Sequence, residues 1–358
     1  MGKVVTVVGA RPNFVKAAAI SEELNESKIR EIIIHTGQHF SPEMSDKFFD
    51  ELNVPYPAYN LDINNLSHGA MTGRMLEKIE VILMSEEPDC VIVHGDTNST
   101  LAGALAASKL RIPVVHVESG VRSFNMNMPE EINRILTDRI SNIRFCVSEE
   151  AIRNLELEGL DSANFISGDV MYDIFLKYKD IAKKRNLPKG LKEKEYGLVT
   201  IHRQENTIHD IILYSIIAAL THIPYKFIFP VHPRIKNLLE HKDFKKLLER
   251  GNIELIPPVG YIDMLNLEMN AKIILTDSGG VQREAYYSHV PSLILRNESE
   301  WVELIREGYA TLVGVSSKQI VKGFDSVMLS NIQFEDGLYG NGYAAKNIVD
   351  QIHFLWGE

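Results

Sequence analysis

The stretch DCVIVHGDTNSTLAGALAASKL, residues 89–110, joins an apolar run to a polar turn and then to a helical pattern. The run is continuously apolar and does not alternate, which is typical of a parallel strand covered by helices on both faces. Small and apolar residues then recur at helical spacing over 99–110. The stretch therefore predicts one strand–turn–helix unit of a doubly wound parallel sheet.

The same pattern recurs along the chain. Other short runs rich in Val and Ile, each ending in polar or small residues, lie at 3–10, 30–37, 113–119, 143–148, 196–203, 225–232, 252–258, 271–277 and 291–296. An amphipathic helical pattern covers 73–86, between two of these runs. We therefore predict an α/β fold with two doubly wound, Rossmann-like parallel sheets.

The chain length of 358 residues exceeds what one ordinary hydrophobic core supports. The stretch 170–195 is charged, contains Pro188 and Gly190, and lacks a strand pattern. We place an N-terminal α/β domain at 1–172 and a C-terminal α/β domain at 173–343. A helix at 344–358 could pack back on the first domain.

The composition is that of a globular protein, with 45% hydrophobic and 24% charged residues. The formal net charge of -10 argues against a nucleic-acid partner. Cys90 and Cys146 lie in apolar runs, so we expect two buried residues and neither a disulfide nor a metal site. The chain shows no signal-peptide pattern and no apolar run near 18 residues, so we predict a cytoplasmic protein with no membrane partner.

In open parallel sheets, ligands bind beyond the carboxyl ends of the strands. Polar, small or charged residues stand at nearly every such end here: 9–12 with Lys16, 36–39, 94–97, 118–120, 202–203, 232–234 and 277–280. So many polar ends indicate one large polar site, which we expect in the cleft between the two domains.

The segment IILTDSGGVQREA, residues 273–285, gives the sharpest phosphate signal. Ser278, Gly279 and Gly280 separate a strand from a helix, whose N-terminal N–H groups can bind an anion. Glu284 lies one turn further, within reach of ribose hydroxyls. Alternatively, the glycines form a tight turn and Glu284 is a surface charge. The segment is neither a Walker loop nor a GxGxxG motif.

Cationic residues stand at other strand ends. Arg11 and Lys16 follow the first strand, and His202 and His232 each close a strand of the second domain. Two histidines that face one cleft favour anion or sugar contacts. Alternatively, Arg11 and Lys16 are solvated surface cations, and His202 and His232 are structural residues.

The acidic residues Asp96, Glu118 and Glu130 are expected to approach one another from adjacent strand ends and the loop beyond them. Carboxylates crowded in a cleft raise one another's pKa, which can make one an acid and another a base near neutral pH. Arg122 and Arg134 would keep part of the group ionised. A purely structural ion-pair network is the alternative.

Eight ordered motifs carry a family resemblance. They are GARPNFVKAA, HTGQHF, HGDTNSTLAGALAA, HVESGVRS, PEEINR, HRQEN, PVHPR and TDSGGVQREA. Over nearly the whole length the chain resembles the non-hydrolysing UDP-N-acetylglucosamine 2-epimerases, which share the architecture of GT-B glycosyltransferases. The resemblance implies inversion at C2 of a UDP-sugar, by elimination of UDP to a glycal and its re-addition. It also implies no cofactor, a homodimer, and a role in surface polysaccharide synthesis.

The resemblance also implies roles for individual residues. Asp96, Glu118 and Glu130 are the acid/base candidates, with His202 and Arg134 near the sugar and diphosphate. The expected substrate contacts are Arg11, Lys16, Gln38, His232, Tyr261 near the uracil, Ser278, Gly279 and Gly280 at phosphate, and Glu284 at the ribose. UDP and the UDP-sugar are therefore the expected partners, and no metal is implied.

The chain departs from the common family pattern at Ala10, at 123–125 and at 300–303. Together with GLYGNGYA at 337–344, these differences resemble the branch that acts on UDP-2,3-diacetamido-2,3-dideoxyglucuronate. Residues 40–42 and 67–68 differ from the family's regulatory second site. The competing functions are a GT-B glycosyltransferase, a hydrolysing epimerase and a non-catalytic UDP-sugar sensor.

Overall fold

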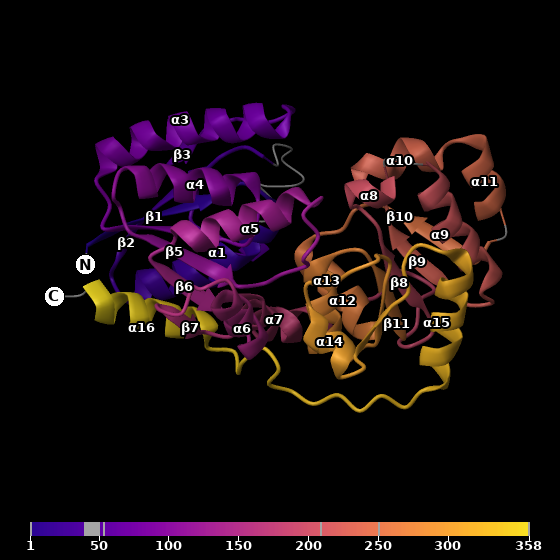
Figure 1. The fold of residues 1–358 in the computed structure, drawn as a ribbon. Coiled ribbons are helices and arrows are strands. Elements are labelled where there is room, and N and C mark those ends of the chain that lie inside the picture. Colours follow the sequence, from indigo (N-terminus) through magenta and orange to yellow (C-terminus); the bar gives the residue numbers. More distant parts are fainter. Residues whose placement is uncertain (1, 39–50, 53, 208–209, 250, 357–358) are drawn as a thin grey trace. The chain divides into compact units, whose positions relative to one another are not determined.

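The computed structural model describes residues 2–38, 51–52, 54–207, 210–249 and 251–356. Contacts divide the chain into two compact units, which are each described separately. Unit 1 contains Met1–Lys177 and Gly337–Glu358, and unit 2 contains Tyr178–Asp336. The chain leaves unit 1 within helix α7 (Val170–Lys183) and returns at Gly337 (Figure 1).

Unit 1 is built on a seven-stranded sheet in the order β3-β2-β1-β4-β5-β6-β7. Its strands are β1 (Lys3–Val8), β2 (Arg30–His35), β3 (Tyr59–Asn60), β4 (Cys90–His94), β5 (Val114–Ser119), β6 (Ile143–Cys146) and β7 (Asn164–Ile166). Every neighbouring pair is parallel. The carboxyl ends of β1, β4 and β5 therefore lie side by side at one edge of the sheet.

Helices cover both faces of this sheet (Figure 1). They are α1 (Arg11–Glu26), α3 (His68–Glu86), α4 (Asn98–Lys109), α5 (Pro129–Ile140), α6 (Glu149–Leu157), α7 and α16 (Ala344–Trp356). Buried residues of α3 and α4 pack with Val5, Val91 and Val93 on one face. The C-terminal helix α16 contacts α1. Burial on both faces explains why the strand sequences are continuously apolar.

Unit 2 has a six-stranded parallel sheet in the order β10-β9-β8-β11-β12-β13. Its strands are β8 (Gly197–Thr200), β9 (Phe227–Pro230), β10 (Ile253–Ile256), β11 (Ile273–Thr276), β12 (Ser292–Ile294) and β13 (Ala310–Leu312). Strand order reverses direction at β8 and β11, and that is the point where an open α/β sheet binds ligands.

The helices of unit 2 also cover both sheet faces. They are α8 (Gln204–Thr207), α9 (Asp210–His222), α10 (Pro233–Leu239), α11 (Lys242–Leu248), α12 (Tyr261–Asn270), α13 (Gly279–Tyr287), α14 (Val302–Arg306) and α15 (Ser317–Leu329). Val199, Phe229 and Leu275 pack beneath α9, α11 and α15. Leu198 and Ile274, one residue away, pack on the opposite face with α12 and α13. The prediction of two doubly wound α/β sheets is confirmed.

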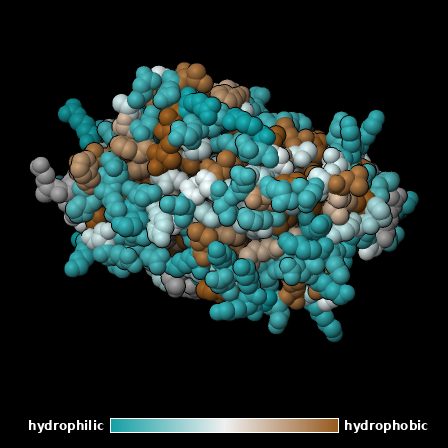
Figure 2. Space-filling view, turned by 90° about the horizontal axis from the view of Figure 1, so that it is seen from below, coloured by the Kyte–Doolittle hydropathy of each residue, from teal (hydrophilic) through white to brown (hydrophobic). Residues whose placement is uncertain are grey.

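Hydrophilic residues dominate the surface visible in Figure 2, and hydrophobic residues appear there in separate small patches. Across the described residues, no helix combines the length and the apolarity that crossing a membrane requires. Cys90 and Cys146 are free and buried, as their apolar surroundings predicted.

Candidate active site

Two polar strand ends of unit 1 meet at a buried ion pair. Lys16 on α1 places its Nζ atom 2.7 Å from Oε1 of Glu118 on β5. The two side chains are only 4% and 8% exposed. A pair with so little solvent contact is screened much less than a surface pair.

The backbone of Glu118 is unusual for a residue with a side chain. Its φ is +69°, and the pairing of β5 with β6 becomes irregular between Val117 and Ser119. A left-handed conformation at a non-glycine residue costs about 1–3 kcal/mol and persists only where surrounding structure holds it. The irregularity releases Glu118 from the regular ladder at the end of the strand.

Gly95 lies beneath the same ion pair. Its φ is +62°, and a Cβ atom built there would lie 2.8 Å from Nζ of Lys16. Glycine satisfies both the backbone conformation and the close approach of the lysine. Glycine at this position thus lets the turn after β4 pass close to Lys16, and Asp96 is the next residue of that turn.

Asp96 pairs with Arg134 on α5, with 2.6 Å between Oδ2 and Nη2. Arg134 also pairs with Glu131, which lies on its own helix one turn earlier. Asn133 donates its amide to the Asp96 carbonyl at 2.9 Å. The N-terminal part of α5 therefore fixes both the backbone and the side chain of Asp96.

Glu130 and Glu131 are adjacent but have different surroundings. Glu131 is fully buried, and its carboxylate accepts from the backbone N–H of Ser123 and Phe124 and from the Ser123 hydroxyl. Among the described residues, Glu130 forms no hydrogen bond or ion pair, and its side chain is half-buried. The sequence prediction assigned a role to Glu130 and none to Glu131. The i,i+3 spacing to Arg134 in PEEINR was the signal that could have found it.

Arg122 does not pair with the three predicted acids. It contacts Asp138 at 2.7 Å and forms a bidentate pair with Glu158. Burial opposes ionisation of Asp138, but His116 and Arg122 outweigh burial and lower its pKa below the ordinary value. The predicted charge cluster therefore divides into a part at Asp96 and Glu118 and a part beneath them at Asp138.

His94 ends β4 directly before this turn. Burial, reinforced by Lys16, lowers the pKa of its ring to about 3, so the ring is neutral at physiological pH. Within the described part of the chain, neither ring nitrogen has a hydrogen-bond partner. Its carbonyl accepts from Asn13 and Thr100, which ties β4 to α1 and α4.

Gln38 accepts a hydrogen bond from the Ser99 hydroxyl at 2.9 Å, which links the end of β2 to α4. Arg11 is the first residue of α1, and its side chain lies outside what the structure describes. The segment 40–42, where we expected changes in a regulatory site, also lies outside the described residues.

In unit 2, Asp277 organises the turn that carries His202. The buried Asp277 carboxylate accepts from the backbone N–H groups of His202 and Arg203 and from the Asn206 amide. The side chain of His202 remains 41% exposed. Its centroid lies 5.7 Å from that of His232, so the structure brings the two predicted histidines together.

The predicted phosphate turn stands at the start of a helix. Ser278 caps α13, and its hydroxyl accepts from the N–H of Val281 at 3.4 Å. A Cβ atom on Gly279 would lie 3.0 Å from Nε1 of Trp301, whereas one on Gly280 would meet only ordinary contact distances. Both glycines are half-buried at this helix start, and the N–H groups of a helix N-terminus are the kind of groups that bind an anion.

Glu284 and Tyr261 are less accessible than a ligand contact usually is. Glu284 is 6% exposed on α13, and Tyr261, the first residue of α12, is 4% exposed. Tyr261 packs edge-on against Tyr178, with ring centroids 6.4 Å apart. Gly260 is the N-cap of α12, which follows the edge strand β10.

A charged cluster near the phosphate turn escaped the sequence prediction. Buried Arg296 pairs with Glu300 at 2.8 Å, and Arg203 contacts the same carboxylate at 3.3 Å. The Arg283 guanidinium lies 3.9 Å above the ring of Trp301. Arg296 and Glu300 are four positions apart in one loop, whereas Arg203–Glu300 and Arg283–Trp301 join separate segments, for which a single sequence offers no local signal.

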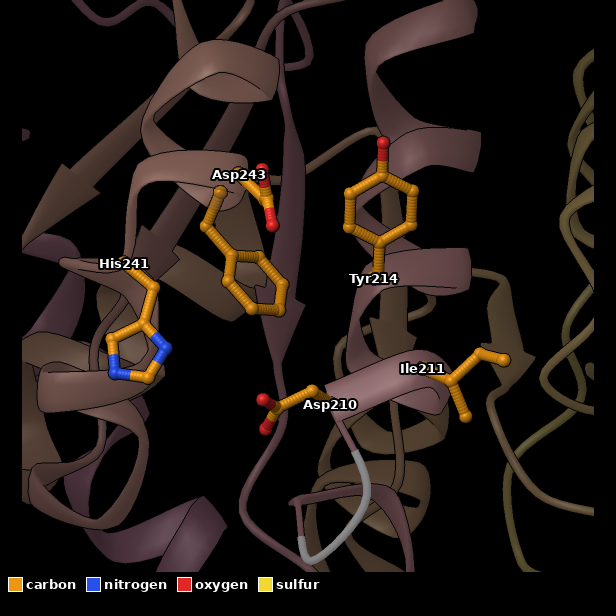
Figure 3. A pocket seen from close by; sticks show the side chains of 6 residues that line it. Asp210, Ile211, Tyr214, His241 and Asp243 are labelled. Carbon is orange, nitrogen blue, oxygen red and sulfur yellow. The ribbon is translucent and has the colours of Figure 1, made fainter.

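A separate small cavity lies between α9 and the start of α11 (Figure 3). Its volume is about 190 Å³, and it is lined by Asp210, Ile211, Tyr214, His241, Asp243 and Phe244. Ligand pockets typically measure about 300–1,000 Å³. The lining contains none of the predicted site residues. Over the described residues, no group of three or more His, Cys, Asp or Glu side chains could hold a metal ion.

The two sets of residues suit complementary tasks. Unit 1 presents carboxylates that are held by buried cations, as proton transfer requires. Unit 2 presents a helix start, two histidines and an arginine, as anion binding requires.

Comparisons with known proteins agree over almost the whole chain. A family profile described as UDP-N-acetylglucosamine 2-epimerase matches residues 22–353. A UDP-N-acetylglucosamine 2-epimerase homolog of Methanococcus maripaludis is 49% identical, over 99% of this chain and 100% of the relative. The UDP-2,3-diacetamido-2,3-dideoxy-D-glucuronate 2-epimerase of Pseudomonas aeruginosa is 45% identical, over 98% and 99%.

Solved structures give the same result. The UDP-GlcNAc 2-epimerase of Methanocaldococcus jannaschii, in complex with UDP-GlcNAc and UDP, matches with a TM-score of 0.93 and 40% identity. The match covers 98% of this chain and 99% of that one. The chain belongs to the UDP-N-acetylglucosamine 2-epimerase family.

Proposed function

We propose that this protein is a non-hydrolysing 2-epimerase of a UDP-2-acetamido sugar. The observation that carries the proposal is the buried pair of Lys16 and Glu118 at a strained strand end, with Asp96 fixed on the adjacent strand end. Family membership gives this arrangement its chemical context. The reaction is an isomerisation, so it needs no cofactor and consumes no water.

The reaction proceeds by elimination and re-addition. A base takes the proton from C2, the C–H electrons form the C1=C2 bond of the glycal, and the C1–O bond breaks with its electrons leaving on UDP. UDP then attacks C1 again, while an acid delivers a proton to the opposite face of C2. Asp96, Glu118 and Glu130 are the proposed proton carriers, and Lys16 and Arg134 hold the first two in place.

Unit 2 is proposed to hold the UDP part. The start of α13 at Ser278, Gly279 and Gly280 binds phosphate, and His202 and His232 stabilise the charge that develops on the departing diphosphate. Arg11, Gln38, Tyr261 and Glu284 complete the proposed substrate contacts. Because UDP is retained by these groups, it remains available for re-addition to the glycal.

Product analysis tests this function. Incubation with UDP-N-acetylglucosamine should give its manno epimer, with total UDP-sugar constant and no free sugar. Release of free sugar with stoichiometric UDP would identify a hydrolysing enzyme instead. Transfer of the sugar to an added acceptor would identify a glycosyltransferase, and tight binding without either product would identify a sensor.

A second substrate has a specific observation in its favour. Identity to the P. aeruginosa UDP-2,3-diacetamido-2,3-dideoxy-D-glucuronate 2-epimerase is 45%, between the 49% to the M. maripaludis UDP-N-acetylglucosamine 2-epimerase homolog and the 42% to the M. jannaschii UDP-N-acetylglucosamine 2-epimerase. The altered loop 123–125 follows directly after Glu118 and Arg122, where a changed sugar substituent would be accommodated. Parallel assays with both UDP-sugars, compared by kcat/KM, decide between the two substrates.

Further parts of the proposal concern the cellular setting. We propose a cytoplasmic homodimer that supplies a UDP-sugar for surface polysaccharide synthesis. The nucleotide-sugar chemistry of the family supports the biosynthetic role. Analytical ultracentrifugation would test the dimer, since a monomer over the working concentration range contradicts it.

A further inference from the structure

The strongest unassigned feature is a buried ionic network beneath the two acid-bearing turns of unit 1. His116, in the middle of β5, has no exposed surface. Its Nδ1 atom lies 2.7 Å from Oδ1 of Asp138, and its Nε2 atom lies 2.7 Å from the carbonyl oxygen of Gly95. Neither partner can donate a hydrogen bond. Both ring nitrogens must therefore donate, and the ring is a buried imidazolium.

The counter-ion of this imidazolium is also fully engaged. Asp138 accepts from His116 through Oδ1, and from the N–H of Gly120 and the guanidinium of Arg122 through Oδ2. Arg122 is anchored in turn by its bidentate pair with Glu158. With both carboxylate oxygens bonded and two cations adjacent, Asp138 stays ionised. The two cations of the network, His116 and Arg122, are then balanced by the two carboxylates of Asp138 and Glu158.

The network ends on the residues that flank the proposed proton carriers. Gly95, which accepts from His116, precedes Asp96, and Gly120, which donates to Asp138, follows Glu118 by two positions. Gly95, Glu118 and Gly120 have φ values of +62°, +69° and +74°. Gly95 and Gly120 adopt this conformation without strain, whereas Glu118, which carries a side chain, keeps it only when surrounding contacts fix it.

We infer that His116 is a positioning residue, which as an imidazolium clamps the β4 and β5 turns and so fixes Asp96 relative to Glu118. The inference rests on the proposed function only for its effect on turnover. Proton transfer to C2 requires donors placed to within a fraction of an ångström, and a 1 Å displacement can cost about a hundredfold in rate. The buried charge thus acts by holding the β4 and β5 turns in place, and His116 itself contacts no reacting atom.

Two isosteric variants separate the two arms of the clamp. In His116→Asn, the amide nitrogen replaces Nδ1 and keeps the bond to Asp138, but it loses the bond to Gly95. In His116→Gln, the amide nitrogen replaces Nε2 and keeps the bond to Gly95, but it loses the bond to Asp138. Glu31→Gln is the matched control, since Glu31 is a buried carboxyl on β2 whose bonded partner Thr6 lies away from both turns.

The first readout is independent of catalysis. Nitrogen-15 NMR of the imidazole near neutral pH should show both His116 nitrogens protonated in the wild type. Hydrogen exchange at the Gly120 N–H should be about tenfold faster in His116→Gln than in wild type, because its acceptor is released. A ring with one unprotonated nitrogen, or unchanged Gly120 exchange, would overturn the clamp.

The second readout is turnover per folded molecule. Both variants should lose about tenfold or more in kcat while UDP affinity, which we assign to unit 2, stays unchanged. Glu31→Gln should keep the wild-type kcat. If the variants merely unfold more easily but retain kcat per folded molecule, His116 is structural only and the inference fails. A wild type with no turnover but with the NMR and exchange results above would instead refute the proposed function.

Discussion

The adjacent carboxylates Glu130 and Glu131 differ in what they bond, and this difference makes their roles separable. Glu131 is surrounded by donors from Ser123, Phe124 and Arg134, and it holds the loop after β5 against α5. Glu130 forms no hydrogen bond or ion pair within the described residues, so its carboxylate is available to a substrate. Burial and bonding therefore distinguish Glu131, which is bonded within the fold, from Glu130, the proposed proton carrier beside it.

Exchanging each of the two acids for glutamine should give opposite results. Glu131→Gln replaces an ionised acceptor by a neutral one that meets Arg134, so the free energy of unfolding should fall by about 1–3 kcal/mol. Glu130→Gln should leave that free energy unchanged and lower kcat by about 10²-fold. Urea unfolding and turnover of both variants check the prediction. Equal loss of stability in the two variants would contradict it.

Glu118→Gln should retain UDP binding and lose most turnover, about 10²–10⁴-fold in kcat. The variant removes the charge that Lys16 pairs with and the proposed proton carrier at once. Calorimetric titration with UDP and an epimerisation assay measure the two properties. Wild-type turnover in a folded Glu118→Gln protein would remove this residue from the mechanism.

Helix α13 is the element that the proposed phosphate contacts depend on, and its first two residues are glycines with different surroundings. A methyl group on Gly279 meets Nε1 of Trp301 at 3.0 Å, and Trp301 is itself held under Arg283. A methyl group on Gly280 meets only Oγ of Ser278, at 3.8 Å. The two positions thus form a matched pair within one turn.

Gly279→Ala should lower the free energy of unfolding by about 1–2 kcal/mol, because the tight contact must be relieved by moving packed groups. Gly280→Ala should be neutral or stabilising by up to about 1 kcal/mol, because alanine favours the helix. Thermal unfolding of the two variants, side by side, checks this. A more severe loss in Gly280→Ala would mean that the start of α13 is packed differently.

Among the elements, those with strong sequence patterns were predictable and the short edge strands were not. Runs such as 89–96 and 271–277 became β4 and β11, since burial on both faces demands continuous apolar residues. Strands β3, β7 and β13 have only two or three residues and carry no period that a pattern could reveal. They form because the neighbouring strand offers an open edge.

The site was partly predictable for a similar reason. The strand-end positions of Asp96, Glu118 and His202 follow from the fold class, because parallel strands deliver their carboxyl ends to one edge. The partners Lys16–Glu118 and His116–Asp138 are 102 and 22 positions apart. Such pairs depend on side-chain geometry in the folded chain, which one sequence does not encode in any local pattern.

Across the whole of unit 1, stability should depend on pH through the contact that holds the C-terminal helix. Asp173 on α7 accepts from the first N–H groups of α16, at Ala344 and Ala345. Burial, with Asp169 and Glu23 nearby, raises the pKa of Asp173 from 3.8 to about 6 despite these two bonds. A raised carboxyl pKa means that the folded state binds the proton more tightly than the unfolded state does. The stability that protonated Asp173 contributes is therefore lost as pH rises from about 4 through 6.

Asp173→Asn should therefore remove this pH dependence and raise the free energy of unfolding at neutral pH by about 2 kcal/mol. A shift of about two pKa units corresponds to roughly 3 kcal/mol, and loss of one acceptor bond offsets about 1 kcal/mol. Unfolding measured from pH 4 to 8 checks it. Asp350→Asn, at an exposed position of α16 that pairs with Lys346, is the control and should change little. A less stable Asp173→Asn at neutral pH would contradict the account.

At the scale of the whole molecule, the proposed function requires this chain to move a proton at C2 of a UDP-2-acetamido sugar. Proton NMR of the protein with UDP-N-acetylglucosamine in heavy water tests it most directly, followed by the diacetamido-glucuronate nucleotide. The account predicts deuterium at C2 together with the manno-configured epimer for at least one of the two. A C2 position that stays protonated in both sugars, in a folded protein that binds UDP, would contradict it.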